Sequence, residues 1–335
     1  MAGEVTLLVF ALCVGSAILH ASWNMAARKV KGDLAVLTGG MVMALSVLTP
    51  IALFVPKKAP WLDALPFVIA TGVTHVFYTA LLGLMYAHAD GAVSVVYPAA
   101  RGTGVAGTAL LAGPILSEPI RAKAWGGILC VVVGILLLGT AKPLSRFLKK
   151  RVAALRRVED ATQMLAGGRP PGPMELTEAV EPSPVPSQQW CGGTQRAICF
   201  GMMCGATIIC YNLVDKAGVG VTHPLHYMVG MLVVQVLGLA PYLLLCKPCG
   251  RALCASAWRD KKRYMAAVGF GPSLTYLIIL HALTLAKASV VTALREVSVV
   301  FGALFGVIFL GEEVSVPMVV GVGCVVVGLV TIKLS

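Results

Sequence analysis

The sequence has few charged residues for its length. Only 13% of the 335 residues are Asp, Glu, Lys or Arg, whereas 58% are hydrophobic and the mean hydropathy is +0.85. Ordinary soluble domains carry about 25% charged and about 45–50% apolar residues. The composition therefore excludes a typical soluble domain and indicates a membrane protein.

Motifs of the common enzyme classes are also missing. No Gly-rich phosphate loop, HExxH or GxSxG motif occurs in a suitable setting. The Gly-Thr-Gly at 102–104 lies inside an apolar run and lacks the strand that precedes a dinucleotide-binding fingerprint. We therefore expect neither catalysis nor a cofactor.

The ten cysteines do not form the pattern of a disulfide framework. Six of them lie within apolar runs, where cysteine packs as a small hydrophobic residue. Cys246 and Cys249 form one CxxC pair with Cys254 nearby, but no second pair or His cluster completes a structural zinc site. We expect no metal, and reduced thiols in a loop beside the membrane that are open to palmitoylation.

The net charge of +12 is explained by membrane topology better than by nucleic-acid binding. If alternate loops share one side of the membrane, that side carries 18 Lys and Arg residues and the other side carries 7. The positive-inside rule then places the long central loop in the cytosol and both termini outside. Neither an aromatic-studded basic surface nor a known nucleic-acid-binding module is visible.

Apolar runs of roughly 20 residues recur along the chain, and each is long enough to cross a ~30 Å hydrocarbon core as a helix. We predict an all-α membrane protein with ten transmembrane helices, five in each half of the chain. The predicted spans lie near 5–27, 34–55, 63–86, 91–114, 122–140, 195–216, 224–245, 264–286, 288–310 and 314–333.

A repeat relates the two halves. Residues 94–134 align without gaps with residues 288–328, and 14 of the 41 aligned pairs are identical, including Arg101 with Arg295. A charge near the bilayer centre costs about 2.5–3.5 kcal/mol on insertion scales, so such a residue usually faces a cavity or a partner. Because five spans per half is an odd number, we predict two inverted repeats with a binding site between them.

The chain therefore divides into three parts. We predict a first five-helix repeat over 1–140 and a second over 195–335, separated by the polar stretch 141–194. Its segment 142–157 places apolar residues on one helical face among Lys and Arg residues, which suits a helix lying on anionic lipid. The Pro- and Gly-rich remainder predicts a disordered linker.

Polar side chains inside the spans are the candidates for a substrate site. No acid lies within one helical turn of Arg101, so we expect Arg101 to bind substrate, with an ion pair to Glu296 as the alternative. Glu296 directly follows Arg295 and is expected to tune it or to carry a coupling proton. The predicted substrate-binding residues are His20, Trp23, Asn24, Tyr78, Tyr97, Arg101, Tyr211, Asn212, Tyr276, His281, Arg295 and Glu296.

Other polar residues are expected to have structural roles. Tyr227 is typical of the aromatic belt at a membrane interface. Asp215 lies near the end of a predicted span, which favours a position in the headgroup region. Glu118 follows the end of a span, which favours a loop or a contact between the halves, and His75 suits a bond to a neighbouring helix as well as a substrate contact.

Short motifs recur in both halves. They are ILHASWNMAARK at 18–29, GAVSVVYPAARGTG at 91–104 with SEP at 117–119, NLVDKAGV at 212–219, and ASVVTALREVSVVFGALFGVIFLGEE at 288–313. These stretches resemble the EamA-type branch of the drug/metabolite transporter superfamily, and the first is also similar to the HAxWN motif of carriers associated with phosphonate use. The resemblance implies ten helices around a central cavity, with Tyr97, Arg101 and Arg295-Glu296 on family motifs. It also implies cytosolic termini, against the charge count, so the orientation stays open.

We therefore predict an integral, multi-pass secondary transporter that moves a small polar metabolite by alternating access. An anionic or zwitterionic substrate is favoured, such as an amino acid, an organic acid or a phosphonate-like compound, because two Arg residues lie at mid-depth. The alternatives are an exporter of lipophilic cations or drugs and a non-transporting scaffold acting through 141–194. The expected partners are the substrate and the bilayer, with anionic lipid at 142–157 and no nucleic acid. A homodimer, and the choice between plasma membrane and organelle, are left open.

Overall fold

The computed structural model of the chain describes residues 6–30, 33–56, 61–88, 93–139, 193–310 and 314–335, and no β-strand occurs among them. These residues form helices and short connections, as an all-α protein requires. The basic segment 142–157 and nearly all of the predicted linker lie outside the described residues.

The first half forms long helices whose ends are fixed by local contacts. Asp33 begins α2, because its carboxylate accepts hydrogen bonds from the backbone N–H groups of Ala35 and Val36 (3.0 and 3.5 Å). After α4, Ser117 adopts a left-handed conformation (φ 53°) and the N–H of Glu118 turns back to a carbonyl of α4. The helices are α1 (Leu7–Lys29), α2 (Leu34–Phe54), α3 (Trp61–His88), α4 (Val93–Leu116) and one over 122–139.

The second half departs from the predicted spans in two places. A short helix, α9, occupies part of the expected cysteine-bearing loop, and the predicted span 288–310 is broken at Glu296. The elements are α7 (Gly193–Val221), α8 (Pro224–Pro241), η1 (Tyr242–Cys246), α9 (Gly250–Asp260), α10 (Lys262–Leu285), α11 (Ala288–Arg295), α12 (Val297–Leu310) and α13 (Val316–Lys333).

Seven stretches of the described residues are long and apolar enough to cross a membrane as helices. A helix lies over each of the ten predicted spans, with α11 and α12 together covering the ninth. That all ten cross the membrane stays a prediction. The seven stretches are Leu34–Phe54, Leu62–Leu82, Ala122–Gly139, Pro224–Cys246, Lys262–Leu285, Ala288–Phe305 and Val316–Lys333.

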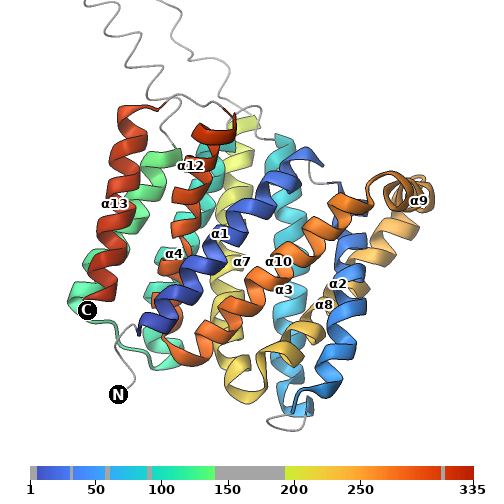
Figure 1. Cartoon of the computed structure of the whole chain (residues 1–335), viewed down its shortest axis with the longest axis horizontal. Coiled ribbons are helices and arrows are strands. Elements are labelled where there is room, and N and C mark those ends of the chain that lie inside the picture. The colour runs from blue at the N-terminus through green and yellow to red at the C-terminus, as the bar shows by residue number, and fades with distance from the viewer. Residues whose placement is uncertain (1–5, 31–32, 57–60, 89–92, 140–192, 311–313) are drawn as a thin grey trace, which may run out of the picture.

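Helices of the two halves are interleaved (Figure 1). α7 packs against α3 and α4 of the first half, and α1 packs against α10. The apolar core between them includes Ile128, Ile208 and Leu280. Large apolar side chains also cover the outside, with Phe54 89% exposed and Leu245 76% exposed. Such an outer surface suits hydrocarbon and is rare on soluble proteins.

The start of α1 and the end of α13 lie at the same end of the bundle, and α9 lies toward the other end (Figure 1). A contact between these two helices supports this placement. The ammonium group of Lys333, in the last turn of α13, lies 4.8 Å from the centroid of the Phe10 ring, near the start of α1. We call the two ends the terminal end and the α9 end. α4 runs toward the terminal end, so the turn that holds Glu118 lies there.

The last helix of each half packs on its counterpart, the helix over 122–139 against α13. A methyl group added at Gly127 would lie 2.7 Å from the carbonyl oxygen of Gly328, and one at Gly134 would lie 2.7 Å from that of Gly321. In the sequence repeat, Gly127 corresponds to Gly321 and Gly134 to Gly328. The contacts are therefore reciprocal, as they are across a two-fold axis.

We expect Gly127→Ala to destabilise the folded protein by about 1–3 kcal/mol, because the added methyl group overpacks a contact between two helix backbones. Gly126→Ala is the matched control, because a methyl group there meets no atom within 4 Å. Thermal unfolding of both purified variants in the same detergent measures the difference. Equal melting temperatures would contradict this close approach.

Candidate functional site

A buried ion pair joins the two halves at the middle of α4. Arg101 donates from Nε to Oε2 of Glu296 at 3.1 Å and from Nη2 to Oε1 at 2.7 Å. Arg101 is 4% exposed and Glu296 is 2% exposed. Two parallel N–H···O bonds make this a strong, charge-assisted contact. The structure therefore gives Arg101 the ion-pair geometry that the sequence held as the alternative to substrate binding.

Glu296 reaches Arg101 at the break between α11 and α12. Its backbone (φ −69°, ψ −8°) leaves the regular helix, and its N–H donates to the carbonyl of Ala293, three residues back. Irregular backbone at membrane depth is tolerated where it is buried in protein. The carboxylate bonds to Arg101, and among the described residues it makes no hydrogen bond to its neighbour Arg295.

Three buried nitrogen atoms near this pair have no hydrogen-bond partner among the described residues. They are Nε of Arg295, Nε2 of His20 and Nε1 of Trp23. The rings of His20 and Trp23 meet edge to face at 5.1 Å on α1, which packs against α11. A buried polar group left unsatisfied costs about 1–3 kcal/mol. This group of nitrogens therefore marks a place where a ligand with acceptor atoms would be stabilised.

Arg295 lies among polar groups from several helices. Its guanidinium carbon is 5.6 Å from the centroid of the Tyr276 ring on α10, a distance typical of a cation–π contact. It is also close enough to act electrostatically on His20 of α1, His75 of α3 and Asp215 of α7. Residues of both halves therefore surround the Arg295 guanidinium and interact with its charge.

Aromatic rings surround His75. Its ring stacks on Tyr211 with centroids 4.4 Å apart, and the rings of Tyr276 and Tyr78 approach it at 5.3 and 6.5 Å. Nδ1 of His75 lies 2.9 Å from the carbonyl oxygen of Thr71, which fixes the ring orientation. Three of the four predicted site tyrosines therefore lie together, and His75 belongs to their cluster.

Asp215 is deeply buried, in contrast to the expected headgroup position. It is 1% exposed, and its carboxylate accepts hydrogen bonds from the hydroxyls of Thr71 (2.6 Å), Tyr227 (2.9 Å) and Tyr276. α7 continues to Val221, so Asp215 lies more than one turn inside the helix. Tyr227 is fully buried as well, which contradicts its expected place in an interfacial belt.

The remaining predicted site residues have different positions. Asn212 is buried and donates from Nδ2 to Oγ1 of Thr108 at 3.2 Å, which ties α7 to α4. His281 is exposed and is not brought into the polar region. The side chains of Asn24 and Tyr97 lie outside the described part of the structure.

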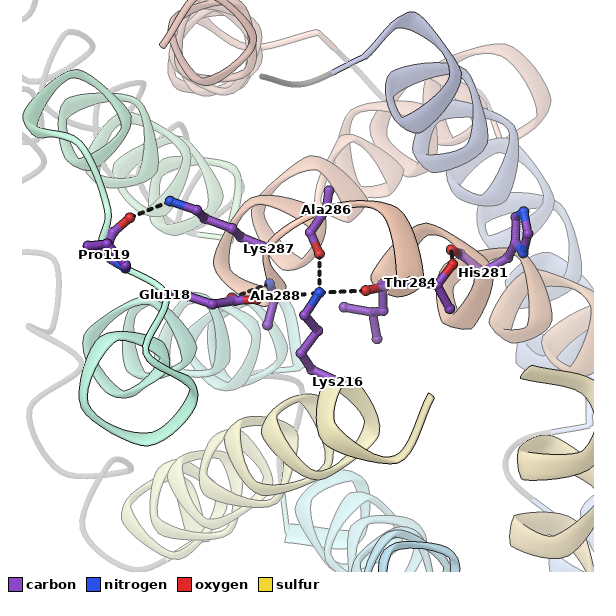
Figure 2. A network of polar contacts seen from close by, with 9 residues as sticks. Glu118, Pro119, Lys216, His281, Thr284, Ala286, Lys287 and Ala288 are labelled. Atoms are coloured by element: carbon purple, nitrogen blue, oxygen red, sulfur yellow. Dashed lines mark hydrogen bonds and ion pairs between the residues drawn. The ribbon is translucent and has the colours of Figure 1, made fainter. Parts of the chain in front are cut away.

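A second set of polar contacts joins the halves at the terminal end (Figure 2). Nζ of Lys216 donates to the carbonyls of Leu283 and Ala286, both at 2.7 Å, and lies 3.4 Å from Oε1 of Glu118. Oε2 of Glu118 accepts the N–H of Ala288 at 2.8 Å, at the start of α11. The carboxylate of Glu118 therefore satisfies both a helix N-terminus and an ammonium group.

A matching ion pair lies at the α9 end. Nζ of Lys261, between α9 and α10, is 2.7 Å from Oδ2 of Asp33, between α1 and α2. Both ends of the bundle are thus closed by an ion pair between the halves. The polar region around Arg295 lies buried between them.

Comparison with known proteins agrees with this architecture. Residues 195–334 match the family model of the EamA-like transporter family. A solved structure described only as "Crystal structure of protein" aligns with a TM-score of 0.64 at 15% identity, over 97% of this chain and 96% of its own. That likeness shows a shared fold alone. No curated protein matches the sequence significantly.

The fold and the apolar outer surface define an integral, multi-pass helical membrane protein. Its second half is similar to the EamA-like transporter family, and the motifs of both halves resemble the same branch of the drug/metabolite transporter superfamily. The resemblance seen in the sequence is thereby confirmed.

We expect Glu296→Gln to destabilise the protein by about 3–5 kcal/mol, because it leaves the Arg101 charge buried and unpaired. The double variant with Arg101→Gln removes both charges and should recover much of the loss. Thermal unfolding of the wild type and both variants provides the measurement.

The control for this pair is Arg259→Gln, because that side chain is 78% exposed beside Asp260. It should change stability by less than about 1 kcal/mol. Equal instability of the single and double variants would show that the two buried side chains do not depend on each other.

Proposed function

We propose that this protein is a secondary transporter for a small anionic or zwitterionic metabolite. The substrate binds beside Arg295, between two inverted five-helix repeats. The observation that carries the proposal is the group of buried nitrogens that have no partner among the described residues: the N–H donors of Arg295 and Trp23, with Nε2 of His20 beside them. A carboxylate or phosphoryl-type group would supply acceptor oxygens and a negative charge to this place.

The reciprocal glycine contacts support the inverted repeat. Gly127 meets Gly328 while Gly134 meets Gly321, and the two members of each contact come from different positions of the repeat. Cys130 faces Cys324, its own counterpart, as expected for residues beside a pseudo-two-fold axis. In transporters of this type, substrate binds near the midplane at the interface between repeats.

The two central arginines have different roles in this proposal. Arg101 is neutralised by Glu296 and holds the halves in register. Arg295 keeps an unpaired Nε and stacks on Tyr276, so it is the guanidinium that can bind an anion. The substrate site therefore depends on Arg295 more directly than on Arg101.

The ion pairs at the two ends support alternating access. Glu118–Lys216 closes the terminal end and Asp33–Lys261 closes the α9 end, and in each pair one residue comes from each half. Breaking one pair while keeping the other would open the buried site to one side. Ion pairs with partly exposed partners are weak, so switching them requires little free energy.

Export of a lipophilic cation is a second candidate. The observation that favours it is the aromatic cluster of His75, Tyr211 and Tyr276 beside the acid Asp215. A scaffold acting through 141–194, anionic lipid at 142–157, and a homodimer stay predictions from the sequence.

We expect anionic or zwitterionic metabolites to raise the melting temperature of the wild type. A ligand present at 100 times its Kd stabilises by about 2.7 kcal/mol. Arg295→Gln should lose this stabilisation, because the guanidinium that meets the anion is gone. The measurement is thermal unfolding against amino acids, organic acids, phosphonates, sugar phosphates and cationic drugs.

Arg259→Gln is the matched control, because it removes an exposed guanidinium and should keep the stabilisation. A response to cationic drugs alone, unchanged in Arg295→Gln, would favour the cation exporter and overturn the anion site.

We expect Lys216→Gln and Lys261→Gln to open opposite ends of the protein. A reporter cysteine at Ser289 tests the terminal end and one at Thr38 tests the α9 end, since both positions are buried. Lys216→Gln should speed labelling of the Ser289→Cys reporter severalfold, and Lys261→Gln should do so for Thr38→Cys. Labelling with a membrane-impermeant maleimide, corrected for proteins without the reporter, gives both rates. Faster labelling of both reporters in either variant would indicate general loosening instead.

A further inference from the structure

Asp215 is the buried acid that no ion pair neutralises. Among the residues that the structure describes, the other buried acid is Glu296, which binds Arg101. The carboxylate of Asp215 instead accepts from the neutral hydroxyls of Thr71, Tyr227 and Tyr276. An intramembrane acid of this kind is costly and usually has a function.

Several titratable groups surround Asp215, but none of the described residues forms an ion pair with it. Its own helix carries Tyr211, stacked on His75, and Lys216, which bonds to Glu118 and to two carbonyls. The helices packed on α7 contribute His75 from α3, Arg101 from α4, Tyr227 from α8, Tyr276 from α10 and Arg295 from α11.

The geometry favours a proton over a metal ion as the ligand of Asp215. The hydroxyl oxygens of Thr71 and Tyr227 touch the carboxylate directly, at 2.6 and 2.9 Å. A sodium ion would have to lie between these oxygens and push them apart. A proton binds to one carboxylate oxygen and needs no such space.

We propose that Asp215 is a proton-binding site whose protonation rearranges the contact between the two halves. The ionised carboxylate is purely an acceptor and takes all three hydroxyls, whereas a protonated carboxyl makes one oxygen a donor. At least one hydroxyl must then rotate to accept, or find another partner. Thr71 belongs to the first half and both tyrosines to the second, so the change falls on their interface.

One consequence rests on the proposed function. The charges of Arg101 and Glu296 cancel, and Asp215 opposes the charge of Arg295. Protonation of Asp215 leaves Arg295 as the uncompensated charge, which favours an anion beside it. A proton and a monovalent anion then bind together and cross in the same direction, with no net charge moved.

Infrared difference spectroscopy of the whole protein in nanodiscs, between acidic and alkaline buffer, tests the proton site without any substrate. We expect a carbonyl-stretch band of a protonated carboxyl in the wild type and its loss in Asp215→Asn. Tyr227→Phe should shift the band, because one hydrogen bond to that carboxyl is removed. Tyr242→Phe should leave it in place, since that ring is 45% exposed and does not touch Asp215.

Two outcomes would overturn the proposal. A wild-type spectrum without a band that Asp215→Asn or Tyr227→Phe alters would make Asp215 a fixed structural acceptor. A band that changes when sodium replaces choline at constant pH would make the site a sodium site. If Asp215→Asn does not fold, the shift in Tyr227→Phe decides. Loss of ligand binding in Arg295→Gln tests the proposed function separately.

Discussion

Hydrocarbon offers no hydrogen bonds, so each charge inside a membrane protein must find its partner in the protein, and this requirement organises the middle of the molecule. Arg101 and Glu296 satisfy each other across the two halves, so the ion pair also fixes how α4 meets the break between α11 and α12. At this break the carboxylate of Glu296 bonds to Arg101 of the other half. Arg295 is buried next to this acid, yet its Nε has no hydrogen-bond partner among the described residues.

The duplication explains why one of the two central arginines has an acid partner and the other, Arg295, has none among the described residues. Arg101 and Arg295 occupy the same position of the repeat, but the counterpart of Glu296 in the first half is Gly102. Glu296 is therefore the one acid that the repeat places next to these two arginines, and it forms an ion pair with Arg101. At the helix pair over 122–139 and α13 the repeat has stayed symmetric, with glycines in reciprocal contact. Packing thus keeps the symmetry of the two halves, while the polar interior has lost it, which leaves the proposed binding site with one distinct charge.

The helices could be predicted from the sequence because an apolar run of about 20 residues is typical of a transmembrane helix. Tyr78, Tyr211 and Tyr276 were predicted as substrate-binding residues, and the structure places their rings together. The burial of Asp215 and its bonds to Thr71 and Tyr227 were not predicted. Thr71 and Asp215 are 144 positions apart, and no local pattern reports such a contact. The sequence did contain one signal for the position of Asp215. Asp215 follows Tyr211 by four positions, so the two side chains share one face of their helix. The same geometry explains why His281 is exposed: five residues after Tyr276, it points about 140° away from that ring.

The central claim is that an anion bound beside Arg295 crosses the membrane through this protein. The most direct test is exchange of a radiolabelled anion that stabilises the protein, measured in proteoliposomes loaded with the same unlabelled compound. The account predicts saturable exchange above that of empty liposomes, lost in Arg295→Gln and kept in Arg259→Gln. Binding of the anion without any exchange in the wild type would contradict transport and leave a membrane-bound receptor or scaffold.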